Sequence, residues 1–179
     1  MFKALVVYES MFGNTRRVAQ AIASGLQGFA TVSLVNVNAA GRALPGVDLL
    51  VVGGPTHAHG MTRKATRAEA ERWANDPGKH LRLVPGAPGA GVREWLSTLK
   101  RAPGLVASFD TRAGIPEFLS RSAGAKIENE LARRGPMKLR GHESFLLHGN
   151  GEISNTELLR ARDWGTRLGT VLATARLTG

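Results

Sequence analysis

The sequence predicts an α/β protein, a doubly wound three-layer sandwich built on a five-stranded parallel sheet with strand order 2-1-3-4-5. Two observations predict this class. Five short apolar stretches alternate along the chain with segments of helical periodicity. The first and third of these stretches, residues 4–8 and 48–55, are nearly unbroken apolar runs, as expected of strands that are buried on both faces. Right-handed crossovers on such a two-sided sheet favour the stated order.

The first half of the chain begins with a strand, a loop and a helix. Apolar residues at four-residue steps predict this helix, which Gly28 ends. The weak alternation of residues 29–37 predicts a peripheral strand, and residues 38–46 predict a connection with at most one helical turn. Residues 48–55 predict a buried strand that ends in a glycine–proline break, and residues 66–73 predict a helix.

The second half repeats the alternation after an irregular segment, rich in proline and glycine, at about residues 75–91. Helices are predicted at residues 92–99 and 122–134, and strands at residues 105–109 and 144–148. Ser154 and Glu157 form a capping-box pattern at the start of the last helix. Because the parts on either side of the irregular segment are too short to stand alone, residues 1–179 are expected to form one domain.

Composition narrows the functional classes. The chain has no cysteine, which excludes disulfides, zinc–thiolate sites and a cysteine nucleophile. It has no signal-peptide pattern and no apolar run near the ~20 residues of a membrane span, so we expect a cytoplasmic location without membrane insertion. The net charge of +10 favours anionic partners, but an arginine-rich, solvated surface is the simpler interpretation. Since no nucleic-acid motif accompanies this charge, nucleic-acid binding is not expected.

The loop between the first strand and the first helix has the composition of a phosphate site. It consists of Ser10, Met11, Phe12, Gly13, Asn14 and Thr15. A loop in this position places backbone N–H groups at the positive end of a helix dipole, where Ser10 and Thr15 add hydroxyl donors. The P-loop nucleotide motif and the glycine-rich dinucleotide motif are both absent. The alternative is an ordinary capped helix start in an α/β protein.

Residues 10–15 resemble the Ser/Thr-x-Thr-Gly-x-Thr loop that wraps the phosphate of flavin mononucleotide (FMN) in the flavodoxin family, with Phe12 where that family usually has a hydroxyl residue. Two further loops follow in the family's order. The second resembles the loop over one face of the flavin ring and comprises Pro55, Thr56, His57, Ala58, His59, Gly60 and Met61. The third takes the place of the family's other ring loop and comprises Phe109, Asp110, Thr111 and Arg112. The resemblance implies a flavodoxin-like fold, FMN as the cofactor and these three loops as its site.

The third loop lacks the tyrosine that flavodoxins usually stack on the ring. His57, His59 or Met61 is therefore expected to stack from the second loop, and burial of Phe109 in the sheet is the alternative to a contact from the third. Two histidines two residues apart, without a third ligand, do not predict a metal site. Ser10 lacks the Gly-x-Ser-x-Gly elbow of a hydrolase, so no catalytic triad is expected.

The resemblance implies an FMN-binding electron-transfer protein whose redox partner is another protein, an acidic one if the basic surface takes part. Two alternatives stay open. One is an enzyme on the same fold, an oxidoreductase that uses NAD(P)H to reduce a quinone or FMN, since quinone reductases of this superfamily share a Pro-Thr loop like Pro55-Thr56. The other is a flavin-free binding module with a basic surface. Bleaching of the bound flavin by NAD(P)H would distinguish the enzyme from the electron-transfer protein.

Overall fold

The computed structural model describes residues 1–57, 60–114, 122–135, 141–149 and 151–175. Within these residues the chain forms a five-stranded sheet in the order β2-β1-β3-β4-β5, in which all neighbouring strands run parallel. The strands are β1 (Phe2–Tyr8), β2 (Ala30–Asn36), β3 (Leu49–Pro55), β4 (Leu105–Ala113) and β5 (His142–Leu147). The predicted fold class and strand order are confirmed.

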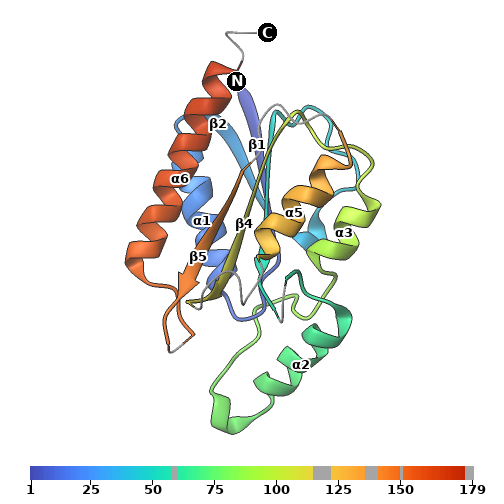
Figure 1. Ribbon diagram of the computed structural model, residues 1–179, viewed down its shortest axis with the longest axis vertical. Coiled ribbons are helices and arrows are strands. Elements are labelled where there is room, and N and C mark those ends of the chain that lie inside the picture. Colours follow the sequence, from blue (N-terminus) through green and yellow to red (C-terminus); the bar gives the residue numbers. More distant parts are fainter. Residues whose placement is uncertain (58–59, 115–121, 136–140, 150, 176–179) are drawn as a thin grey trace.

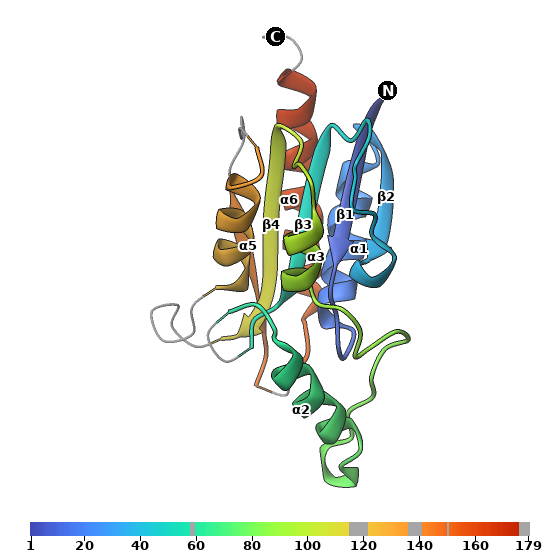
Figure 2. The same ribbon diagram turned by 90° about the vertical axis from the view of Figure 1, so that its right-hand side faces the viewer.

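Helices cover both faces of the sheet and complete the three layers (Figures 1 and 2). One face carries α1 (Asn14–Leu26) and α6 (Asn155–Thr174), and the other carries α3 (Val92–Thr98) and α5 (Ala123–Ala132). A hydrophobic core lies between the sheet and each helical layer. Every residue of the central strand β3 except Pro55 is buried, because helices pack on both of its faces.

Helices α1 and α6 approach each other backbone to backbone. A Cβ atom at Gly25 would lie 2.1 Å from the carbonyl oxygen of Arg162, and a Cβ atom at Gly165 would lie 2.3 Å from that of Ile22. Such short distances leave no room for a side chain at either position. Glycine at these two points therefore permits the tight crossing that forms this layer.

Helix α2 (Lys64–Ala74) packs on neither layer. Figure 2 shows it beyond the carboxyl ends of the strands, followed by the short 3-10 helix η2 (Pro77–Lys79). Only Arg67 and Ala70 are buried in α2. Arg67 donates a hydrogen bond to Thr62 Oγ1 (3.1 Å) and pairs with Glu94 of α3 (3.0 Å), which ties the helix to the sandwich.

The observed elements differ from the predicted ones mainly at their ends. Strand β4 runs to Ala113 rather than to residue 109, because residues 110 and 111 still pair with β3 and residues 110–113 pair with β5. The predicted single helical turn in residues 38–46 is η1 (Val37–Ala39). Ser154 caps α6 as predicted, but the Glu157 carboxylate bonds to Leu146 N (2.7 Å) and to Arg160. None of the helices in the described ranges is long and apolar enough to cross a membrane.

Candidate functional site

The candidate site lies at the carboxyl ends of the parallel strands. At this end of the sheet the strand order reverses between β1 and β3. In doubly wound sheets this reversal separates neighbouring loops and leaves a crevice in which ligands bind. The loop after β1 (residues 10–15) and the loop after β3 (residues 56–61) leave the sheet on either side of this point. The end of β4 lies next to that of β3, since Pro55 pairs with Thr111.

The loop after β1 leads into an uncapped helix start. Gly13 is the N-cap of α1, has φ +100° and makes no capping hydrogen bond through a side chain. Its N–H donates to Ser10 Oγ (3.1 Å), which folds the loop back on itself. The N–H groups of Asn14, Thr15 and Arg16 have no acceptor within the helix, whereas Arg17 N already donates to Gly13 O (3.0 Å). The same turn contains no acidic residue and carries Arg16 and Arg17, both exposed, so this helix start suits an anion.

Other residues of this loop anchor it to distant parts of the chain. Thr15 Oγ1 and Thr111 Oγ1 lie 2.8 Å apart in a buried hydrogen bond between α1 and β4. The Asn14 side chain donates to Gly151 O (2.7 Å) and accepts from Ile153 N (3.3 Å). The carbonyl of the buried Met11 accepts from Val84 N (2.8 Å), while Phe12 is half-buried. The loop is thus held by β4, by residues 151–153 and by Val84.

The loop after β3 is a tight turn fixed by both its backbone and Thr56. Thr56 N donates to Thr111 O (2.9 Å), and the N–H and carbonyl groups of His57 and Gly60 bond to each other. Gly60 has φ +143°, a conformation that favours glycine. The half-buried Pro55 begins the loop, and the buried Met61 ends it among the apolar side chains beneath α3 and α5. The predicted site residues Ala58 and His59 lie outside the described residues.

The predicted third loop is part of β4, so its side chains alternate between the two faces. Phe109 is fully buried, with its ring in edge contact with Phe145 (6.4 Å between centroids), and Asp110 is fully buried on the other face. Asp110 Oδ2 accepts from Thr56 Oγ1 (2.9 Å), Ser122 Oγ (2.6 Å) and Gly124 N (2.9 Å). These two side chains therefore support the neighbouring elements from inside the fold, and neither is exposed at the carboxyl ends of the strands. Arg112, beyond them, is half-buried.

The aromatic neighbour of His57 is a residue that sequence reasoning did not place at the site. The ring of Trp73, on α2, lies 6.0 Å from that of His57 between centroids. Burial lowers the pKa of His57 below its ordinary value of 6.5, an effect that Glu69 partly opposes. His57 is therefore neutral at pH 7 and able to act as a hydrogen-bond donor or acceptor. Within the described ranges, no three metal-binding side chains gather here or elsewhere.

A buried polar network lies under the two loops and was also missed. Glu9 directly precedes the loop after β1 and is 3% exposed. Its carboxylate accepts hydrogen bonds from Thr62 Oγ1 and from Val92 N (2.8 Å), and Thr62 in turn accepts from Arg67. This network connects β1, the loop after β3, α2 and α3. Burial raises the pKa of Glu9 above its ordinary value of 4.5, against the effect of these hydrogen bonds.

The raised pKa of Glu9 predicts a pH dependence of stability. Between pH 4.5 and the raised pKa the folded state binds more protons than the unfolded state, so the contribution of Glu9 to stability falls as pH rises through this window. Glu9→Gln is expected to remove this contribution. Urea unfolding of both proteins from pH 4 to pH 8 should show the stability of the wild type falling relative to that of the variant as pH rises through this window. A constant difference would contradict the assignment.

A family model and several solved structures relate this chain to flavodoxins. The family model described as flavodoxin matches residues 6–101. Oxidised Flavodoxin 2 from Bacillus cereus is 16% identical with a TM-score of 0.61, over 94% of this chain and 98% of that chain. The flavodoxin of Streptococcus pneumoniae TIGR4 is 14% identical with a TM-score of 0.60, over 94% and 98%.

The flavodoxin, WrbA-like protein from Agrobacterium tumefaciens is 17% identical with a TM-score of 0.56, over 97% of this chain and 99% of that chain. No curated protein sequence matches the chain. At such identities the similarity to solved structures shows the fold alone.

Proposed function

The chain belongs to the flavodoxin family, and on this premise we propose that it binds FMN at the carboxyl edge of the sheet and transfers electrons to a partner protein. The observation that carries the proposal is the uncapped start of α1, with Gly13 at φ +100° and Arg16 and Arg17 in the first turn. Backbone donors, a helix dipole and two cations together favour a phosphate group at this point.

The donor chemistry of the loop after β1 fits a phosphate. The hydroxyl of Ser10 accepts from Gly13 N, so its own proton stays available for donation to a ligand. In the bond between Thr15 and Thr111 one hydroxyl donates and the other accepts, and the acceptor keeps a proton to donate. A side chain at Gly13 would be strained at its positive φ. Glycine thus keeps the backbone open to a ligand.

The described residues of the loop after β3 limit which side chain contacts a flavin ring. Met61 is 7% exposed and packs in the core, which leaves His57 as the described candidate from this loop. The neutral imidazole of His57 is held beside Trp73 and can hydrogen-bond to a ring atom without adding charge. Thr56 is fixed by Asp110 and by Ala123 N (2.9 Å), so the loop is set before a ligand arrives.

In this proposal the residues of the chain bind the FMN, orient its ring and shield it from water, while the FMN supplies the redox chemistry. The positive net charge suits an acidic partner protein, which we include in the proposal.

The enzyme alternative differs in the source of electrons. If NADH or NADPH alone bleaches the flavin absorbance of the protein, the chain is a reductase. If the absorbance is retained until a protein donor is added, it is an electron carrier.

The first test is the identity of the flavin and the contribution of Thr15 to its binding. Protein denatured after purification should release FMN, and neither riboflavin nor the dinucleotide, in equimolar amount. Thr15→Val removes the hydroxyl nearest the start of α1 and should weaken FMN binding by about 1–3 kcal/mol, or roughly five- to 150-fold. Fluorescence titration of the protein without flavin measures this dissociation constant.

Thr111→Val is the matched comparison for Thr15→Val. Both variants break the same buried hydrogen bond and leave one hydroxyl unpaired, so both should lose similar stability, about 1–3 kcal/mol. Only Thr15→Val removes a donor from the helix start, and its effect on FMN affinity should be clearly the larger. Equal losses of affinity would assign the effect to the hydrogen bond and not to a phosphate contact.

A further inference from the structure

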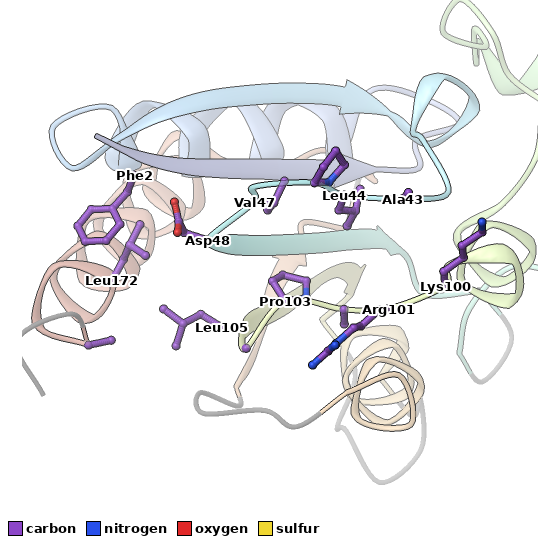
Figure 3. Close-up of a pocket in the computed structure, with 14 residues that line it drawn as sticks. Phe2, Ala43, Leu44, Val47, Asp48, Lys100, Arg101, Pro103, Leu105 and Leu172 are labelled. Carbon is purple, nitrogen blue, oxygen red and sulfur yellow. The ribbon is translucent and has the colours of Figure 1, made fainter. Parts of the chain in front are cut away.

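A cavity of about 790 Å³ opens near the amino ends of the strands, away from the candidate FMN site. Figure 3 shows the residues of its wall. Its wall includes Phe2 at the start of β1, Asp48 just before β3 and Leu105 at the start of β4. These residues mark the amino ends of the strands, whereas the loops described above follow the carboxyl ends. The cavity therefore shares no residue with the candidate flavin site.

The wall of this cavity is mainly apolar and comes from both layers of the sandwich. Phe2, Leu105 and Leu172 contribute from the core beneath α1 and α6. Leu44 and Val47 contribute from the core on the other face. The volume lies in the range of small-molecule sites, about 300–1,000 Å³. A cavity of this size and lining accommodates an aliphatic or aromatic body better than a polar one.

Charge is distributed unequally along the cavity. Figure 3 shows Phe2, Leu105 and Leu172 toward one end and Lys100 and Arg101 toward the other. Both cations are exposed, and neither takes part in an ion pair with another described residue. Asp48, nearer the apolar end, accepts a hydrogen bond from Lys3 N (2.8 Å). An anionic group is thus attracted to the basic end and repelled from the other.

We propose that this cavity binds an aliphatic carboxylate. The hydrocarbon chain lies between Phe2, Leu105 and Leu172, and the carboxylate lies at Lys100 and Arg101. Charge complementarity fixes this orientation, because the reverse one would bring the carboxylate to Asp48. The apolar wall selects for chain length, since each methylene that leaves water adds to the affinity. The site is separate from the proposed FMN function and does not depend on it.

Decanoate is the probe that tests the proposal, used below its micelle-forming concentration in isothermal titration with the 179-residue chain. We expect one saturable site per chain, with an affinity that rises about fourfold for each methylene added from hexanoate to decanoate. Decanol and decyltrimethylammonium should bind more weakly than decanoate. No saturable binding of decanoate, or equal affinity for the three head groups, would overturn the proposal.

Charge-neutral variants locate the site. Lys100→Gln with Arg101→Gln should weaken decanoate binding roughly three- to tenfold and leave decanol binding unchanged. Arg162→Gln with Arg167→Gln removes the same charge from the exposed face of α6 and should change neither. Ala43→Trp places a large ring at the exposed rim of the cavity and should reduce binding of both probes. Equal effects of the two charge pairs, or no effect of Ala43→Trp, would contradict the assignment, whatever the FMN content.

Discussion

Replacing Asp110 by alanine is expected to lower the free energy of unfolding by about 3–5 kcal/mol, because it leaves several buried donors without an acceptor. Asp110 is fully buried, and its Oδ2 atom accepts hydrogen bonds from Thr56, Ser122 and the backbone of Gly124. The same change removes the acceptor of the Thr56 hydroxyl, although Ala123 N of α5 still donates to Thr56, and this loosening of the loop after β3 should lower FMN affinity as well. Denaturant unfolding and flavin titration measure the two effects.

Asp110→Asn is the conservative variant, because it keeps an oxygen acceptor at this position and removes the charge. Oδ1 of Asp110 accepts no hydrogen bond from the described residues, so an amide NH₂ group at that position displaces no donor. The amide oxygen can take the place of Oδ2 and keep its three donors satisfied, with weaker bonds than a carboxylate makes. The buried NH₂ group finds no acceptor among the described residues, which adds to the cost, so we expect a loss of about 2–3 kcal/mol for this variant. Losses as large as those of Asp110→Ala would refute the hydrogen-bonding role.

Gly165→Ala is expected to destabilise the fold by about 2–4 kcal/mol, although alanine is the better helix former by about 1 kcal/mol. The new methyl group would lie 2.3 Å from the carbonyl oxygen of Ile22 on α1. Because this neighbour is backbone, it cannot move aside as the end of a flexible side chain can, and α1 and α6 must separate. The apolar area buried between both helices and the sheet would shrink. Chemical denaturation monitored by circular dichroism measures the loss.

Gly28→Ala is the control for Gly165→Ala. A Cβ atom at Gly28 would have no atom within 4 Å, and the residue is exposed. Its substitution should change stability by no more than about 0.5 kcal/mol. Similar stabilities of the two variants would show that α1 and α6 do not meet at the distance described.

The sequence was sufficient to predict the positions of the first two loops, which follow from local patterns. It was also sufficient to predict the strand order, which follows from the alternation of strands and helices and from right-handed crossovers. Residues 4–8 and 48–55 are short apolar runs typical of buried strands, and Gly13 between a strand and a helix marks the loop after β1. The extent of β4 was not predictable in this way. Asp110 and Arg112 are polar residues that suggest a loop, yet Asp110 is buried because the start of α5 and two hydroxyl groups from elsewhere donate to its Oδ2 atom.

The parts of the site that were missed depend on contacts between residues far apart in the chain. Glu9 bonds to Thr62 and Val92, which lie 53 and 83 positions away, and no periodicity connects them. Trp73 belongs to none of the three loops that the sequence singles out, and its place beside His57 follows from the path of α2. Sequence reasoning could have singled out Glu9 as an acidic residue at the end of an otherwise apolar strand.

The position of α2 beyond the sheet implies that this helix can unfold locally while the rest of the fold stays intact. The helix buries only Arg67 and Ala70, so little apolar area opposes its detachment, whereas the sandwich retains both of its cores. Local opening of α2 costs mainly the contacts of Arg67 with Thr62 and Glu94. Amide hydrogens of α2 are then expected to exchange with solvent well before those of β1 and β3. A ligand that contacts Trp73 would slow this exchange, and part of its binding energy would be consumed in ordering the helix.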